Sequence, residues 1–263
     1  MKKVFLISSP RSYSVCITRV LENVGMFEIF HEPYVPVFDA IHYPDLTKDW
    51  FKAGCFRTSK QVVGAINTAS ESNNDIVGKS MVLIKDMAFA IHDYMGELID
   101  PDSMYILLFR NPLDIFVSFT NKCSEIDNTE ANFIDLSGYQ KLLNISNMLD
   151  SSGCKNKLVV CSDNLEYCLR KIFGFLSLEW NDDYLNLDKV NNLHDYSVKW
   201  HENKHIKLME YWHGEALHGN KIQFRASPVH TVSDFINDQH KDLFIKNKDL
   251  LYSMYDSLIR LSV

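Results

Sequence analysis

Two short polar stretches contain the residue types that bind phosphate or sulfate groups. The first, residues 8–14, reads Ser-Ser-Pro-Arg-Ser-Tyr-Ser, and the second, residues 110–118, reads Arg-Asn-Pro-Leu-Asp-Ile-Phe-Val-Ser. Each directly follows an apolar run, and each contains one of only seven arginines in the chain. Arginine and serine side chains donate hydrogen bonds to oxyanions, as do the unpaired backbone N–H groups at the start of a helix. Both stretches are therefore candidate anion-binding sites.

The first stretch stands where a strand is expected to pass directly into a helix. There the positive end of the helix dipole and several backbone N–H groups converge. Arg11 adds a permanent charge, and Ser12 and Ser14 add hydroxyl donors. A purely structural interpretation is also open, in which Ser12 caps the helix and Arg11 is solvated. The turn lacks the Gly-x-x-x-x-Gly-Lys-Ser/Thr pattern, so a nucleotidase of that type is not predicted.

Candidate groups for proton transfer follow two other apolar runs. Residues 30–33 read Phe-His-Glu-Pro, and a carboxylate such as Glu32 at the end of a strand can accept a proton from a substrate hydroxyl. The alternative is an exposed loop glutamate with His31 packed on the proline. Lys85 and Asp86 follow the run 81–84, where a simple surface ion pair is the alternative to a catalytic role. For Arg110, the corresponding alternative is a salt bridge to Asp114.

Apolar runs without alternation indicate strands that are covered on both faces, as in parallel sheets. Segments between them have helix signals, because residues 15–24 are followed by Gly25 and residues 112–121 begin with a proline. Residues 164–176 have the pattern of an amphipathic helix. The order predicts an α/β fold with a five-stranded parallel sheet flanked by helices, and ligands outside the carboxyl ends of the strands. The five runs are 4–7, 27–30, 81–84, 105–109 and 158–161.

The domain organisation follows from where this pattern stops. From about residue 191 the strand pattern is lost, and residues 242–261 have apolar positions at helical spacing. No linker rich in proline, glycine or serine interrupts the chain. We therefore expect one domain over residues 1–263, with a nucleotide-binding α/β core over 1–180 and a helical C-terminal cap over about 191–263.

Composition excludes several classes of protein. The 263 residues are 46% hydrophobic and 23% charged, with a formal net charge of -7, which argues against broad binding to nucleic acid. No apolar stretch is long enough to span a membrane, and the N-terminal run is too short for the core of a signal peptide. Six cysteines occur without a Cys-x-x-Cys pair, which suits reduced thiols. A cytoplasmic protein is expected.

The two polar stretches together resemble the motifs of a known family, the sulfotransferases that use 3′-phosphoadenosine 5′-phosphosulfate (PAPS). In that family a Pro-Arg/Lys-Ser-x-Ser/Thr turn holds the 5′-phosphosulfate, and Arg-Asn-Pro-x-Asp-x-x-x-Ser holds the 3′-phosphate. Residues 10–14 and 110–118 match both patterns, and residues 158–176 are similar to a late strand and helix of the family. The resemblance covers roughly residues 3–180 and implies a P-loop sulfotransferase-like fold of the prokaryotic-type branch.

The resemblance also implies roles for particular residues. Its donor-binding residues would be Arg11, Ser12, Tyr13 and Ser14 for the phosphosulfate, with Arg110 and Ser118 for the 3′-phosphate. A similar His-Glu-Pro segment borders the active site in the prokaryotic-type branch, so Glu32 would be the base, with His31 as the second choice. Lys85 would stabilise charge, beside Arg11. The reaction would transfer a sulfuryl group from PAPS to a hydroxyl or amine of a small-molecule acceptor without a metal.

The chain departs from the family at four places. Tyr13 stands where many members have glycine, Cys16 where cytosolic members have a tryptophan that stacks on adenine, and Met87 where they have a catalytic histidine. The Arg-Lys-Gly element near the C-terminus is missing, and Arg225 is a possible substitute for part of the 3′-phosphate site. Neither the acceptor nor the oligomeric state is indicated by any residue pattern.

Three other functions compete with this interpretation. A kinase with a degenerate phosphate loop is disfavoured because the Walker lysine is absent, whereas an inactive nucleotide-binding module is compatible with the same turn. Residues 201–205 read His-Glu-Asn-Lys-His, which satisfies the His-Glu-x-x-His signature of zinc hydrolases. The flanking lysines indicate a solvated helix face, so no metal site is expected there.

Overall fold

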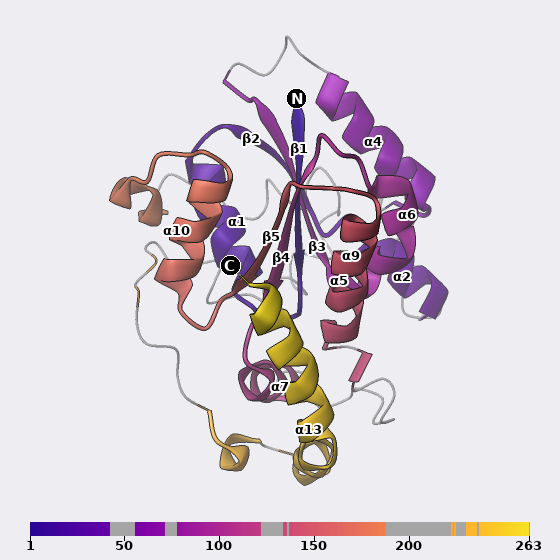
Figure 1. Cartoon of the computed structure of the whole chain (residues 1–263), viewed down its shortest axis with the longest axis vertical. Helices are drawn as coiled ribbons and strands as arrows, with labels where there is room; N and C mark the ends of the chain where they lie inside the picture. Colours follow the sequence, from indigo (N-terminus) through magenta and orange to yellow (C-terminus); the bar gives the residue numbers. More distant parts are fainter. Residues whose placement is uncertain are drawn as a thin grey trace.

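The computed structural model describes residues 1–42, 56–71, 78–121, 134–135, 137–187, 222, 224, 230–235 and 237–262. At its centre is a five-stranded sheet with the spatial order β2-β3-β1-β4-β5 (Figure 1). Every neighbouring pair of strands is parallel. The strands are β1 Lys2–Ser8, β2 Phe27–His31, β3 Met81–Met87, β4 Met104–Phe109 and β5 Lys157–Cys161. The predicted α/β class with five parallel strands is confirmed.

Helices cover both faces of this sheet, which explains why its strands are apolar without alternation. Along β4, Tyr105, Leu107 and Phe109 pack into one core cluster, while Ile106 and Leu108 pack into the other. On one face lie α1 Ser14–Asn23 and α10 Leu165–Phe175 (Figure 1). The other face is packed by α2 Val35–His42, α4 Ser59–Glu71, α5 Ala88–Ile91, α6 Met95–Leu98, α7 Pro112–Thr120, α9 Tyr139–Ser151 and α13 Asp238–Leu261.

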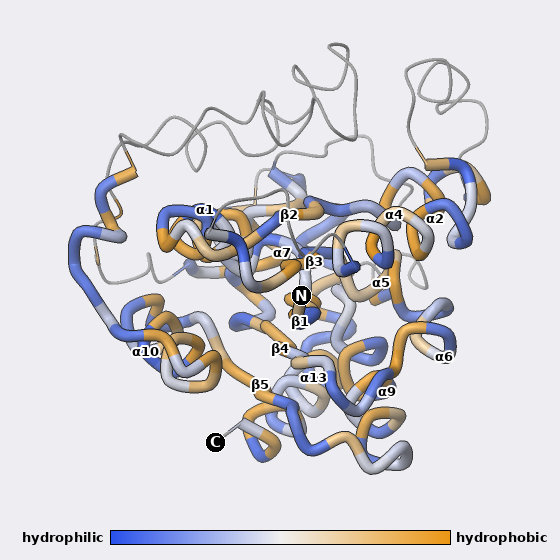
Figure 2. The backbone as a smooth tube through the Cα atoms, turned by 90° about the horizontal axis from the view of Figure 1, so that it is seen from above, coloured by the Kyte–Doolittle hydropathy of each residue, from blue (hydrophilic) through white to orange (hydrophobic). Residues whose placement is uncertain are grey.

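The predicted helices are confirmed as α1, α7 and α10, each within one residue of the expected ends. The C-terminal helix α13 begins four residues earlier than the apolar spacing predicts. Its start is set by Asn237, whose side chain accepts a hydrogen bond of 2.8 Å from the N–H of Gln239. Along these amphipathic helices hydrophilic and hydrophobic positions alternate in Figure 2.

The predicted helical cap over about 191–263 lies largely outside the described residues. Its described end, α13, contacts α7, α9 and β5 and contributes Phe244, Leu251 and Leu258 to the core cluster of one sheet face. Three short 3-10 helices complete the described elements: η2 His92–Tyr94, η3 Asp182–Leu185 and η4 Val232–Asp234. Within the described part of the chain, no helix is both long and apolar enough to cross a membrane.

The strand order fixes where a ligand can bind. β1 lies between β3 and β4, so the chain turns to one side of β1 to form β2 and β3, and to the other side to form β4 and β5. In open parallel sheets, ligands bind at this switch point, outside the carboxyl ends of the strands. The turn after β1 and the junction after β4 are the two segments that border it. These segments are the two polar stretches of the sequence.

Candidate functional site at the carboxyl edge of the sheet

The turn between β1 and α1 presents an uncapped helix N-terminus. The N-cap residue of α1 is Tyr13, and no described side chain caps the helix. The hypothesis that Ser12 caps it is therefore wrong, since the Ser12 hydroxyl donates instead to the Ser9 carbonyl at 2.7 Å. Ser14, which is buried, is the first residue of the helix. The first-turn N–H groups and the positive end of the helix dipole are thus directed at a position where an anion can bind.

Two residues of this turn have left-handed backbone conformations, with φ of 56° at Arg11 and 61° at Tyr13. This conformation favours glycine and costs other residues roughly 1–2 kcal/mol each. A compensating contact is present, because the Arg110 guanidinium carbon lies 4.4 Å from the centre of the Tyr13 ring. Tyr13 therefore connects the turn after β1 to the junction after β4.

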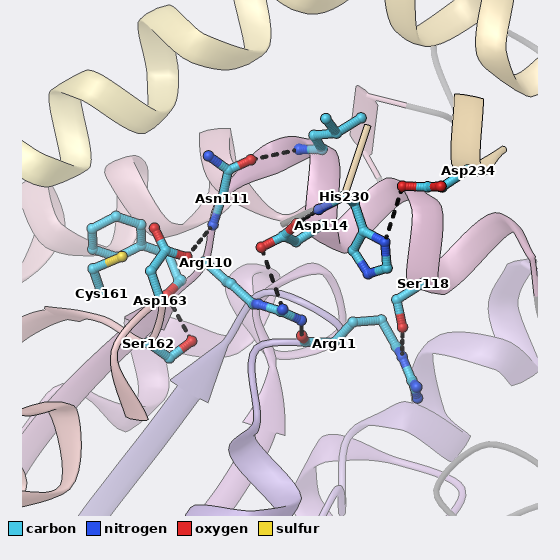
Figure 3. A network of polar contacts seen from close by, with 12 residues as sticks. Arg11, Arg110, Asn111, Asp114, Ser118, Cys161, Ser162, Asp163, His230 and Asp234 are labelled. Atoms are coloured by element: carbon cyan, nitrogen blue, oxygen red, sulfur yellow. Dashed lines mark hydrogen bonds and ion pairs between the residues drawn. The ribbon is translucent and has the colours of Figure 1, made fainter. Parts of the chain in front are cut away.

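The junction between β4 and α7 holds Arg110 in a buried position, 4% exposed. Its Nη2 lies 3.3 Å from an Asp114 carboxylate oxygen, and its Nη1 donates to the Arg11 carbonyl at 3.3 Å (Figure 3). The salt bridge that the sequence leaves open is thus present. Among the described residues, the buried Arg110 Nε has no hydrogen-bond partner, so part of the guanidinium fork is unsatisfied.

A hydrogen bond joins the two polar stretches directly. Arg11 Nε donates to the Ser118 hydroxyl at 2.9 Å, although the two residues are 107 positions apart (Figure 3). The turn is also held to β4 by the Ser9 N–H, which donates to the Leu108 carbonyl at 2.9 Å. The sequence-predicted residues Arg11, Tyr13, Arg110 and Ser118 therefore lie in one cluster, with Asp114 as the carboxylate paired to Arg110.

The candidate proton-transfer groups form a second cluster at the same edge. Lys85, fully buried in β3, forms a hydrogen-bonded ion pair with Glu32, which is 8% exposed. His31 Nε2 lies 3.7 Å from the same carboxylate oxygen of Glu32. The two structural alternatives are therefore wrong: Glu32 is not in an exposed loop, and Lys85 is not in a surface pair with Asp86.

The backbone around Glu32 is held in place by β3. Glu32 has φ of 52°, and its N–H donates to the Lys85 carbonyl at 2.6 Å. The buried Asp86 carboxylate accepts from the Tyr34 N–H at 2.7 Å and from the Met87 N–H at 2.8 Å. Because both of its oxygens are engaged by backbone, Asp86 supports the loop and is a poor candidate for the base.

Sheet register relates the two clusters. His31 is paired with Lys85 across β2 and β3, and Ser8 is paired with Met87 across β1 and β3. Neighbouring strands are about 4.8 Å apart, so Glu32 lies about two strands from the turn that contains Arg11. The carboxyl edge thus has an arginine-rich half over β1 and β4, and a half over β2 and β3 that is rich in carboxylates.

Two carboxylates near Glu32 have strongly raised pKa values. Burial, and secondly the charge of Glu32, raises the pKa of Asp39 in α2 to about 7. Burial also raises the pKa of Asp86 to about 8, with Glu32 adding to the effect, although the two backbone hydrogen bonds and Lys85 act against it. No sequence motif marks Asp39. Asp39 lies near Glu32 because of how α2 packs, and residue spacing along the chain does not predict that packing.

Replacing Asp39 by asparagine is expected to change how stability depends on pH. The pKa of Asp39 in the fold, about 7, is above the ordinary value of 3.8, so the folded state keeps a proton that the unfolded state releases. Its contribution to stability is therefore present below about pH 4 and is lost as the pH rises through 7. Asparagine cannot ionise, so the unfolding free energy of Asp39→Asn relative to the parent should increase from pH 4 to 7. Urea unfolding at several pH values measures this, and a pH-independent difference would contradict it.

Other predicted elements lie beyond the described residues. These are the His-Glu-x-x-His sequence at 201–205 and Arg225. In the part of the chain that the structure describes, no group of three or more histidine, cysteine or acidic side chains is arranged to hold a metal ion. The described cysteines, which are Cys16, Cys154, Cys161 and Cys168, are free thiols.

Comparison with known proteins gives a limited result. No protein-family model and no curated protein matches the chain. Among solved structures, a sulfotransferase from Alicyclobacillus acidocaldarius is similar over 70% of this chain and 88% of its own, with 12% identity and a TM-score of 0.46. A retinol dehydratase in a complex with retinol and PAP is similar over 86% of this chain and 84% of its own, with 12% identity and a TM-score of 0.32.

Proposed function

We propose that this protein transfers a sulfuryl group from PAPS to a hydroxyl or amine of a small-molecule acceptor. The observation that supports this most strongly is the Arg11 to Ser118 hydrogen bond, which unites two anion-binding junctions at the switch point of the sheet. PAPS has anionic groups at both ends of its nucleoside, the 5′-phosphosulfate and the 3′-phosphate. Two adjacent arginine-containing junctions match such a ligand better than they match a single phosphate.

The donors that these junctions leave unsatisfied fit the ligand. Within the described residues, the Ser9 hydroxyl and Arg110 Nε are buried and have no hydrogen-bond partner. Buried polar groups in native proteins are almost always hydrogen-bonded, so such exceptions indicate places where a ligand or water supplies the acceptor. In our proposal, the Ser12 to Ser14 turn and the N-terminus of α1 hold the 5′-phosphosulfate. Arg110 and Ser118 hold the 3′-phosphate.

The chemistry requires a base and a group that stabilises negative charge. The acceptor oxygen or nitrogen attacks sulfur in line, the bond between sulfur and the 5′-phosphate oxygen breaks, and adenosine 3′,5′-bisphosphate (PAP) leaves. Glu32 takes the acceptor proton. Arg11 stabilises the charge that develops on the leaving oxygen. Lys85 holds Glu32 at a fixed position through their ion pair.

The proposal extends to the whole chain. The sulfuryl group has less negative charge than a phosphoryl group, so these residues can act without a metal ion. Residues 1–263 would form one cytoplasmic domain with no affinity for nucleic acid.

A second candidate, an inactive PAPS-binding module, is favoured by one observation. The proposed base Glu32 is nearly buried and already paired with Lys85.

Incubation with PAPS and a library of small-molecule alcohols and amines separates these two candidates. For an enzyme, mass spectrometry should detect a sulfated library member and an equal amount of PAP. Omitting the library, or using Glu32→Gln, should reduce PAP release to a background level. An inactive module would bind PAP but release none from PAPS with any library member, and that result would exclude the transferase proposal.

A further inference from the structure

The peptide group between Arg110 and Asn111 is held from both sides. Its carbonyl oxygen accepts a hydrogen bond of 2.7 Å from the Tyr139 hydroxyl, and its N–H donates to an Asp163 carboxylate oxygen at 2.8 Å (Figure 3 shows the second bond). The other oxygen of Asp163 accepts from the Tyr255 hydroxyl at 2.6 Å. Three elements, α9, the end of β5 and α13, therefore fix the orientation of one peptide plane.

This peptide plane matters because it lies between the end of β4 and the start of α7. After a strand ends, the sheet no longer pairs its backbone groups, so other partners must set their direction. Arg110 Cα is part of this plane, and the direction of its side chain follows from the orientation of the plane. Through Nη1 and the Arg11 carbonyl, that direction also determines how the two anion-binding junctions meet.

Tyr139 is suited to a fixed structural hydrogen bond. It is fully buried at the first position of α9, and burial keeps its pKa well above the usual value of 10, so its hydroxyl remains a donor. The preceding residue, Gly138, has φ of +73° and packs closely on the other junction. A Cβ at Gly138 would lie 3.6 Å from Ser9 Cα and 3.9 Å from Pro10 Cδ. The start of α9 thus lies beside both junctions.

We propose that Tyr139 is a positioning residue of the anion site, which acts by setting the orientation of Arg110 relative to the turn between β1 and α1. No sequence motif assigns it a role, and its hydroxyl is directed at the Arg110 carbonyl. The identity of that ligand, PAP or PAPS, rests on the proposed function. The hydrogen bond to the Arg110 carbonyl is the property that makes Tyr139 specific for the 3′-phosphate half of the site.

The test removes only the hydroxyl, in Tyr139→Phe, and measures binding of PAP and of adenosine 5′-phosphate by isothermal titration. One net hydrogen bond corresponds to roughly a three- to tenfold change in affinity. We expect PAP binding to weaken by that factor and binding of adenosine 5′-phosphate, which lacks the 3′-phosphate, to change less than about twofold. In Arg110→Ala, adding Tyr139→Phe should cause no further loss, because the two changes act through the same contact.

Tyr105→Phe is the matched control. Tyr105 is also fully buried, and its hydroxyl donates to the Leu98 carbonyl at 2.9 Å, but it lies near the opposite end of β4. The Tyr105→Phe variant should bind PAP with the same affinity as the parent protein. If Tyr139→Phe does not fold, Asp163→Ala removes the acceptor on the other side of the same peptide group and has the same expected effect.

The possible results distinguish a failure of the positioning role from a failure of the proposed function. Unchanged PAP affinity in Tyr139→Phe, or an equal loss for both nucleotides, would overturn the positioning role. If the parent protein itself fails to bind PAP, the proposed function is wrong. In that case inorganic phosphate is used as the probe. Its binding is measured by how far it raises the thermal unfolding midpoint of each variant. A smaller rise in Tyr139→Phe than in Tyr105→Phe would then support the positioning role, and equal rises would refute it.

Discussion

Turnover in Glu32→Gln is expected to fall by about 10²-fold or more, while PAP affinity stays close to that of the parent. Glutamine keeps the size of the side chain and its hydrogen-bonding oxygen but cannot accept the acceptor's proton. Rates are measured with an acceptor found in the library experiment, and affinities by titration with PAP. Because binding and proton transfer depend on different halves of the carboxyl edge, only the rate should change.

The substitution also removes the partner of a buried ammonium, so a control must separate chemistry from stability. Asp39→Asn removes a neighbouring carboxyl group but leaves the pair of Lys85 and Glu32 intact. It should retain most of the parental turnover. If Glu32→Gln is fully active, Glu32 is not the base. His31 would then be the remaining candidate, since both oxygens of Asp86 are bound by backbone N–H groups.

Arg110→Ala should weaken PAP binding by about 10- to 100-fold, because hydrogen bonds to a charged group contribute roughly 1.5–3 kcal/mol. Adenosine 5′-phosphate should lose much less affinity, since it has no 3′-phosphate for Arg110 to contact. Titration of both ligands into both proteins measures the difference. Equal losses for the two nucleotides would remove Arg110 from the 3′-phosphate site.

A matched control for Arg110 lies on α10. Arg170 also forms an ion pair with the residue four positions away, in this case Glu166 at 2.9 Å, but it is half exposed to solvent. Exposed pairs of this kind contribute about 0.3–0.5 kcal/mol to stability. Arg170→Ala should therefore leave the affinity for both nucleotides unchanged, so that a loss in Arg110→Ala is attributable to position rather than to charge.

The sheet and its two polar junctions could be predicted from the sequence because their signals are local. Runs such as 105–109 are apolar at every position, since side chains that alternate between two helix layers are buried on both faces. Pro112 marks the first turn of α7 through a local preference that does not depend on the rest of the fold. Both polar stretches could then be placed at the carboxyl edge, because every parallel strand ends there.

The contacts within the site could not be predicted, because they depend on which strands become neighbours. Lys85 meets Glu32 only because β3 pairs with β2, and 53 residues separate the two. Position along the chain left open a surface pair of Lys85 with Asp86, its neighbour, as the alternative to a catalytic role. The same reason explains why Tyr139 has no sequence signal. Its role depends on a hydroxyl that reaches a carbonyl 29 residues away.

A crystal structure with bound PAP tests the central claim most directly, because it needs no acceptor. The account predicts the 5′-phosphate at the N-terminus of α1, bound by the turn that contains Ser12 and Ser14. It also predicts the 3′-phosphate within hydrogen-bonding distance of Arg110 and Ser118. A nucleotide bound elsewhere on the protein, or one whose 3′-phosphate contacts neither residue, would contradict it.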